Sequence, residues 1–245
     1  MKKYALLLFF ILLFSCRQKK DSLLTAQQIV DKSIEVCGGD LYKTSNISFD
    51  FRDITYTLDV TKGQRILKRV ITADSSVVVD VRHPHKFERY INDSLVVLHD
   101  TLANKYANSV NSVHYFAYLP FGLNDAAVNK ELLEKVAIEG QDYYKVKVTF
   151  DQKGGGKDFD DIYVYWFNAD TFKPDFLAYE FHVDGGGMRF REAYNERSIG
   201  GIRFVDYNNY EPEDPLHSIY DIDSLLMAGK LKLLSKIELK NITLE

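Results

Sequence analysis

Apolar and polar residues alternate along most of the chain, the pattern of strands that bury one face and expose the other. The alternating runs are short, and turn signals rich in glycine, asparagine, aspartate or proline separate them. This spacing predicts an antiparallel meander in the first half of the chain. Its clearest strands are expected at residues 64–73, 76–82, 86–91 and 94–99.

The alternation changes parity once inside an earlier run. Ile47, Phe49 and Phe51 are apolar at odd positions, whereas Ile54 and Tyr56 continue the pattern at even positions. An extra residue in one strand has this effect, so the change of parity predicts a β-bulge near residues 52–53.

Two segments depart from the strand period. Near the start, Thr25 and Gln28 have the spacing of a helix capping box, and Gly38-Gly39 supplies a glycine stop. Ile29, Ile34 and Val36 give this predicted helix a partial apolar stripe. Later, residues 100–133 form a mixed, partly helical insert that we expect to cover one face of the sheet.

The second half allows a strand register to be proposed. If residues 184–187 form a four-residue hairpin loop, Phe181 faces Phe190 on one side, and Glu180 faces Arg191 on the other, charged side. Neighbouring strands would extend the apolar side into a long aromatic surface. Its candidate members are Trp166, Tyr179, Phe181, Met188, Phe190 and Phe204. These side chains serve either as ordinary core or as the lining of a ligand cavity.

Together these patterns predict a mainly β (α+β) fold. We expect about ten or eleven strands in a single curved antiparallel sheet or incomplete barrel. The N-terminal helix and the partly helical insert would cover it. One domain, residues 25–245, is expected, with a last strand at residues 231–244.

The first residues carry an export signal. A short basic start precedes an apolar run of about half the 20 residues that a membrane span requires. Leu13, Ser15 and Cys16 resemble the bacterial lipobox, although Phe14 is larger than the usual residue at its position. The resemblance implies removal of residues 1–15, lipid attachment to Cys16 and a tether at residues 16–24. Without it, the segment would be an ordinary secretory signal with an incidental cysteine.

The composition of the chain limits the kinds of partner that it is expected to bind. The chain contains 16 Tyr and 16 Phe, a richness that favours strands. Without the signal, 29 basic residues stand against 35 acidic residues, which argues against nucleic-acid binding. Acylation of Cys16 would leave Cys37 without an internal disulfide partner. Cys37 is then a buried small hydrophobe, a reactive thiol or half of an intermolecular bridge.

The usual catalytic motifs are absent from the sequence. It has no Gly-x-Ser-x-Gly elbow, no His-Glu-x-x-His and no Cys-x-x-Cys pair. His83 and His85 are weak candidates for metal ligands, because side chains two apart on an extended chain point the same way. No catalytic residue and no cofactor are expected, and an enzyme is the less favoured class.

Several stretches resemble an uncharacterised family of Bacteroidota lipoproteins. They are Gly38-Gly39-Asp40-Leu41-Tyr42, Phe49-Asp50-Phe51-Arg52-Asp53, Pro120-Phe121-Gly122-Leu123-Asn124-Asp125, Gly187-Met188-Arg189-Phe190-Arg191-Glu192 and Tyr165-Trp166. That family is distantly similar to the LolA and LolB lipoprotein carriers. The similarity implies an incomplete antiparallel barrel around an apolar cavity for acyl chains.

Three functional hypotheses follow. The leading one is a cell-envelope lipoprotein, anchored through Cys16 to the outer membrane and facing the periplasm, that binds or carries a lipid or a lipoprotein's acyl chains. The second is an envelope hydrolase or metal-dependent enzyme. The third is a structural partner in an envelope complex.

Overall fold

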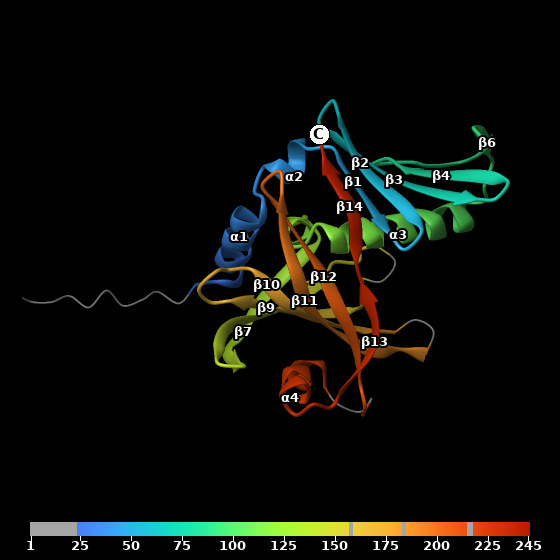
Figure 1. The fold of residues 1–245 in the computed structure, drawn as a ribbon. Coiled ribbons are helices and arrows are strands. Elements are labelled where there is room, and N and C mark those ends of the chain that lie inside the picture. The colour runs from blue at the N-terminus through green and yellow to red at the C-terminus, as the bar shows by residue number, and fades with distance from the viewer. Residues whose placement is uncertain (1–23, 157–158, 183–184, 215–217) are drawn as a thin grey trace, which may run out of the picture.

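The computed structural model describes residues 24–156, 159–182, 185–214 and 218–245. Over these residues the fold is mainly β, as predicted, with fourteen strands in two seven-stranded antiparallel sheets and four α-helices (Figure 1). The predicted signal peptide, residues 1–15, and Cys16 lie outside the described residues. No helix in the described ranges is long and apolar enough to cross a membrane.

The first sheet contains the meander predicted from the first half of the chain. Its strand order is β14-β1-β2-β3-β4-β5-β6, so only β14 comes from elsewhere in the sequence. The bounds are β1 Ile47–Phe51, β2 Ile54–Thr61, β3 Gln64–Ala73, β4 Ser76–Arg82, β5 Phe87–Ile91, β6 Ser94–Val96 and β14 Leu239–Leu244.

The second sheet is a longer meander of order β13-β12-β11-β10-β9-β8-β7. The bounds are β7 Val128–Ile138, β8 Gln141–Phe150, β9 Ile162–Asn168, β10 Pro174–Phe181, β11 Gly187–Ile199, β12 Ile202–Pro212 and β13 Leu231–Ile237. β7 begins inside the segment predicted as a partly helical insert, so the insert is shorter than expected.

The last alternating run joins the two sheets. Residues 231–244 were predicted as one strand, but β13 pairs with β12 in the second sheet, and β14 pairs with β1 in the first. The run therefore changes partner at Glu238, and the strands form two sheets, where a single curved sheet or an incomplete barrel was expected. Alternation reveals that a segment is extended, but it does not reveal which strand lies beside it.

The change of parity near Arg52 marks a hairpin, not the predicted bulge. β1 and β2 are separate strands, and Phe51 pairs with Ile54 across a two-residue turn. Residues that pair across such a turn share a face, so the apolar parity inverts as it would at a bulge. Arg52 occupies the turn with a positive φ of 57°.

The N-terminal helix α1, Ala26–Cys37, begins with the predicted capping box between Thr25 and Gln28. Ile29 and Val30 bury its inner side against the second sheet. Val36, predicted in the apolar stripe, is 48% exposed. A one-turn helix, α2 (Leu41–Thr44), follows the glycine stop and brings Tyr42 into the core of the first sheet.

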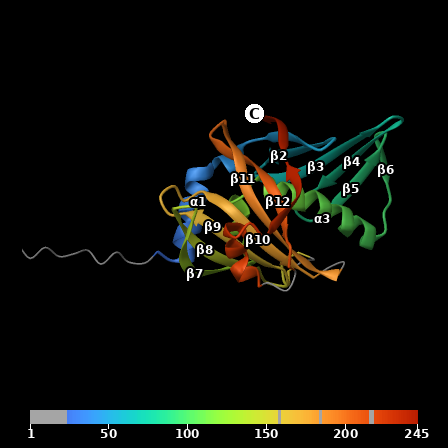
Figure 2. The same ribbon diagram turned by 60° about the horizontal axis from the view of Figure 1, so that its bottom comes forward.

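Helix α3, Asp100–Ala117, bridges the two sheets. In both views it lies beneath the β2–β4 region, and its C-terminal end reaches the second sheet (Figures 1 and 2). Val110 packs in the core of the first sheet, whereas Tyr115 and Phe116 pack against the core of the second. A 3-10 turn, η1 (Phe121–Asn124), leads from α3 to β7.

The second sheet is covered on both faces. Its inner face packs against α1 and the end of α3, and includes Tyr165 and Leu177. Its outer face, with Trp166 and Phe190, is covered by the 3-10 turn η3, Ile219–Asp221, and by helix α4, Ile222–Met227. Strands buried on both faces lose the clean alternation that a half-exposed sheet shows.

Candidate functional site

A cleft of about 250 Å³ opens between α3, the β1–β2 turn and the inner face of β11–β13. We call it the apolar cleft, because most of the side chains that line it are apolar. These are Phe51 at the turn, Val113, Phe116 and Ala117 on α3, and Val205, Tyr207, Ile237 and Leu239 on the sheets. Arg52, an exposed residue, adds a positive charge to the lining.

A short polar row crosses the sheet side of the apolar cleft. Arg191 of β11 pairs with Asn209 of β12, which pairs with Ser235 of β13. Residues paired in this way lie side by side on the same face. All three line the apolar cleft. The Asn209 side-chain nitrogen donates to the Ser235 hydroxyl at 3.2 Å.

Arg191 is the charged residue of this row. Its side chain is buried, with the guanidinium carbon 4.2 Å from the centre of the Phe116 ring and 5.1 Å from that of Tyr179. One terminal nitrogen, Nη2, donates to the Tyr179 hydroxyl at 3.2 Å, while Nε is buried and has no hydrogen-bond partner. Arg191 therefore brings an unsatisfied cationic donor into an apolar site.

On the other side of α3 are two clefts of about 190 and 260 Å³ with more polar linings. Arg82, Asn111, Tyr115 and Asp125 line both. Burial raises the pKa of Asp125, against the influence of the arginines and the lysine nearby. These clefts suit water and polar groups better than a hydrocarbon chain.

The six predicted aromatic-face residues do not share one face. β10 and β11 pair Phe181 with Gly187 and Ala178 with Phe190, three residues away from the predicted register. An odd shift moves side chains to the opposite face. β10 ends at Phe181 and β11 begins at Gly187, with Gly185 and Gly186 in left-handed conformations before it.

The true register separates these residues into three places. Trp166, Met188 and Phe190 lie on the outer face under α4, and Phe204 lies in the core of the first sheet. Tyr179 and Phe181 lie on the inner face, and Tyr179 contacts two residues of the cleft lining, Arg191 and Phe116. None of the six is part of the cleft lining.

Because the predicted β10–β11 register was wrong, Arg191 was not recognised as a site residue. The predicted register placed it on a charged solvent face opposite Glu180, whereas Glu180 pairs with Met188 and Arg191 pairs with Leu177 on the inner face. Asn209 and Ser235 were not identified either, because a short polar residue in a strand usually indicates an exposed position.

A buried ion pair fixes α4 to the outer face. Asp223 accepts from Lys145 Nζ at 2.9 Å and from Trp166 Nε1 at 3.0 Å. Lys145 also donates to the main-chain oxygen of Tyr220. Trp166, predicted as either ordinary core or cavity lining, therefore lies in the packed core beneath α4.

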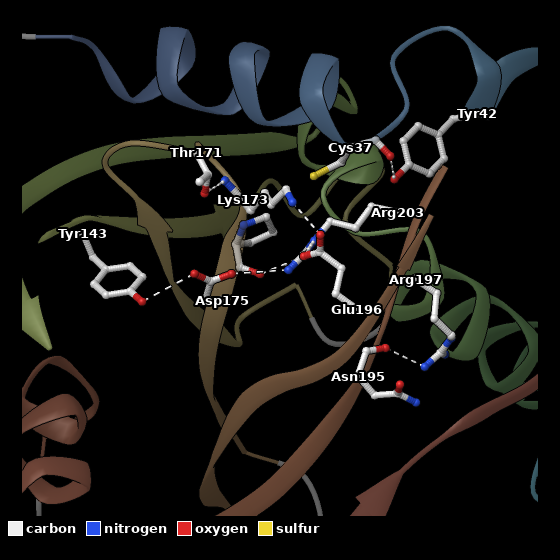
Figure 3. Close-up of polar contacts among 11 residues, drawn as sticks. Cys37, Tyr42, Tyr143, Thr171, Lys173, Asp175, Asn195, Glu196, Arg197 and Arg203 are labelled. Carbon is white, nitrogen blue, oxygen red and sulfur yellow. Dashed lines mark hydrogen bonds and ion pairs between the residues drawn. The ribbon is translucent and has the colours of Figure 1, made fainter. Parts of the chain in front are cut away.

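A second charged cluster lies beneath α1 (Figure 3). Arg203 donates through Nε to Glu196 at 2.8 Å and through Nη2 to Asp175 at 3.3 Å. Glu196 also accepts from Lys173. Burial raises the pKa of Asp175, despite the neighbouring Arg203. The described partners of this buried arginine are protein groups, so the cluster ties the β9–β10 turn to β11 and β12.

Cys37 borders this cluster as a fully buried free thiol. Burial raises its pKa to about 11, although Arg203 acts in the opposite direction. A protonated thiol without solvent contact is a poor nucleophile and cannot reach a second chain. The structure therefore supports the buried-hydrophobe interpretation.

His83 and His85 follow β4, but their side chains have different surroundings and do not share one site. His83 lies 3.0 Å from the Glu88 carboxylate, which also binds Lys86, whereas His85 is exposed in the turn. Asp80, on the same strand, is buried between Arg69 and Arg89. Among the described residues, no three His, Cys, Asp or Glu side chains are grouped to hold a metal ion.

The fold is similar to that of a LolA superfamily protein. The chain aligns with the crystal structure of a LolA superfamily protein from Nitrosomonas europaea at a TM-score of 0.51 and 15% identity, covering 91% of this chain and 94% of that one. A DUF1329 family protein from Desulfovibrio piger aligns at a TM-score of 0.45 and 12% identity over 89% and 92% of the two chains. No curated protein matches the sequence.

A putative outer membrane lipoprotein-sorting protein domain from Vibrio parahaemolyticus also aligns, at a TM-score of 0.32 and 8% identity over 81% and 99% of the two chains. Residues 2–239 match the family of unknown function DUF6503, and the chain belongs to that family. The resemblance to an uncharacterised family is thereby confirmed.

Proposed function

We propose that this protein is a cell-envelope lipoprotein that holds an acyl chain in the apolar cleft. The cleft itself carries the proposal: hydrocarbon side chains of α3 face hydrocarbon side chains of β12–β14 across unfilled space. An apolar wall with a few polar groups is the usual make-up of a small-molecule site. The LolA-like fold supports the proposal, because it provides the same general layout of a helix against an open curved sheet.

The size of the cleft limits the ligand. At about 250 Å³ it lies below the range of about 300–1,000 Å³ typical of sites for drug-sized ligands. It therefore suits one acyl chain or part of one. Each methylene moved from water into such a site contributes about 0.8 kcal/mol, so affinity should rise with chain length until the cleft is full.

A variant in which a bulky side chain fills the apolar cleft tests the proposal. Displacement of the uncharged fluorophore N-phenyl-1-naphthylamine by 1-dodecanol measures binding without involving a charged head group. We expect Ser235→Trp, which places an indole in the cleft, to weaken 1-dodecanol binding about tenfold or more, equivalent to about 1.4 kcal/mol. Lys236→Trp is the matched control, because the next residue of a strand points to the opposite face.

Two results would overturn the proposal. One is a wild-type protein that binds neither the fluorophore nor 1-dodecanol. The other is equal binding by wild type and Ser235→Trp, since a ligand insensitive to a filled cleft must bind elsewhere. Circular dichroism of both tryptophan variants establishes that each is folded.

The proposal includes a lipid anchor on Cys16, which places the domain at the outer membrane facing the periplasm. The lipobox-like residues Leu13, Ser15 and Cys16 support it. Expressed in a Gram-negative host, the wild type should incorporate an alkyne-labelled fatty acid and sediment with outer membranes. Cys16→Ala should lose both properties, while Cys37→Ala should keep the label. Labelling of Cys16→Ala would contradict the assignment.

A further inference from the structure

We propose that the apolar cleft selects acyl ligands with an anionic oxygen head group, and that Arg191 binds that head. This inference rests on the proposed function and adds the chemical class of the ligand. It follows from the surroundings of Arg191, which differ from those of the other buried arginines.

The two other arginines that are as fully buried, Arg69 and Arg203, are paired with carboxylates. Arg69 donates to Asp80 through Nε at 3.0 Å, and Arg203 donates to Glu196 through Nε at 2.8 Å. Arg191 is equally buried, but within the described ranges no carboxylate lies at ion-pair distance from it, and its Nε has no partner. A buried charge without a partner destabilises a fold by several kcal/mol, so an unpaired guanidinium beside a cleft is a position for a ligand anion.

The acidic residue nearest to Arg191 in the sequence points away from the apolar cleft. Glu192 follows Arg191 on β11 and therefore points to the opposite face of the sheet. There it accepts hydrogen bonds from the Tyr210 hydroxyl at 2.9 Å and from Asn208 at 3.2 Å. Its carboxylate cannot also neutralise the cleft side of the strand.

Aromatic rings hold the guanidinium in place. Phe116 of α3 and Tyr179 of β10 each contact it, and the Tyr179 hydroxyl occupies Nη2. This fixes the plane of the group, while the buried Nε stays without a hydrogen-bond partner among the described residues. A donor that is positioned before the ligand arrives gives up little side-chain entropy on binding.

The remainder of the polar row supplies further hydrogen bonds. Asn209 Oδ1 is buried without a partner while Nδ2 donates to Ser235. Rotating the amide by 180° exchanges these atoms, so that Oδ1 accepts from the Ser235 hydroxyl and Nδ2 becomes a second free donor. Arg52 adds a second positive charge to the cleft lining. Cationic and neutral donors thus accompany the hydrocarbon walls.

Four ligands with the same chain and different heads test the inference on the full-length protein. They are dodecanoate, dodecyl phosphate, 1-dodecanol and dodecylamine, each displacing N-phenyl-1-naphthylamine at pH 7.5. A hydrogen bond to a charged group contributes about 1.5–3 kcal/mol, so we expect the better of the two anions to bind about tenfold to a hundredfold more tightly than the alcohol. The amine should bind more weakly than the alcohol.

Arg191→Met should abolish the preference for anions, so that the two anions bind no more tightly than 1-dodecanol. Arg189→Met is the matched control, since Arg189 lies on the same face of β11 but outside the cleft lining. It should keep the preference. The ratio of the two anions identifies the head, with a tighter carboxylate indicating a fatty acid and a tighter phosphate a phospholipid-like ligand.

The outcomes separate the two proposals. If the wild type binds the alcohol, the amine and the anions equally, this inference is wrong and the proposed function stands. If no ligand binds, the proposed function fails with it. The wild-type preference decides the matter even if Arg191→Met does not fold, and Arg191→Lys, which retains the charge without the Nε donor, should then show a reduced preference.

Discussion

His114 lies among aromatic rings beneath the first sheet. Its ring meets those of Phe49 and Tyr56 edge to face, at 5.8 and 5.6 Å between ring centres. Nε2 lies 3.1 Å from the main-chain oxygen of Lys68, and Nδ1 lies 3.1 Å from the Tyr118 hydroxyl. A carbonyl can only accept, so Nε2 carries the proton and Nδ1 accepts from the tyrosine. The ring is therefore held in its neutral form.

This histidine makes the folded state sensitive to mild acid. Burial lowers the pKa of His114 to about 4, from an ordinary value of 6.5. Below pH 6.5 the unfolded chain binds a proton that the folded chain does not, so stability falls as the pH decreases from 6.5 towards 4. From pH 7.5 to 5.0 the loss should be about 2 kcal/mol from this residue.

Urea unfolding at the two pH values measures this loss. His114→Gln keeps a donor for the Lys68 oxygen but does not titrate, so its unfolding free energy should change less between pH 7.5 and 5.0. His85→Gln, which removes an exposed histidine, is the comparison and should follow the wild type. An equal pH dependence in wild type and His114→Gln would show that another group is responsible.

Among the helices, α1 covers the inner face of the second sheet through a narrow stripe. Ile29 and Val30 are fully buried, whereas Val36 is 48% exposed on the same helix. Ile29→Ala should lower the free energy of unfolding by about 2–5 kcal/mol, since it removes buried methylenes and leaves a cavity. Val36→Ala should leave stability unchanged or slightly raise it, because alanine is the better helix former.

Denaturant unfolding of the two alanine variants compares a buried and an exposed position on one element. A small effect of Ile29→Ala would mean that α1 contributes little to the core of the second sheet. A large effect of Val36→Ala would point to a contact that the described residues do not show.

The bounds of the helices and strands could be predicted from the sequence better than the pairing of the strands. β3 and β4 have the predicted bounds, and α1 begins at the predicted capping box, because each depends on residues close in sequence. The β10–β11 register was wrong by three residues, because a run of three glycines allows more than one loop length. The apolar cleft depends on this register and on α3, so its Arg191 could not be recognised from sequence.

The two faces of the second sheet also show what could not be predicted from the sequence. Trp166 and Tyr165 are adjacent and both fully buried, one beneath α4 and the other towards α1. A sequence with apolar residues at successive positions does not show which of the two faces encloses empty space. The sequence indicated an apolar sheet surface correctly, but it directed attention to the side that α4 fills.

Across the whole molecule, the two sheets are joined where β13 gives way to β14, and Asp206 of β12 is the residue that secures this junction. Its Oδ1 accepts from the main-chain nitrogen of Leu239 at 2.9 Å and from Arg197 Nη2 at 2.8 Å. Its Oδ2 accepts from Asn195 at 2.6 Å and from Arg197 Nη1 at 2.9 Å. Leu239 itself lines the apolar cleft, so this carboxylate links the sheet junction to the site.

Asp206→Asn should therefore weaken the junction and the site together. It removes the charge that pairs with the partly exposed Arg197 and half of the acceptor capacity, and we expect a loss of about 2–3 kcal/mol in unfolding free energy. Hydrogen exchange should accelerate in β1 and β14 and remain slow in β8 and β9, which lie far from the junction in the strand order. 1-Dodecanol affinity should decrease, since the Leu239 wall of the cleft is no longer fixed.

Asp142→Asn, which breaks the exposed pair with Lys135, is the control and should change neither exchange nor affinity. Uniform acceleration over both sheets would instead mean that they unfold as one unit, with the junction no weaker than the rest of the fold.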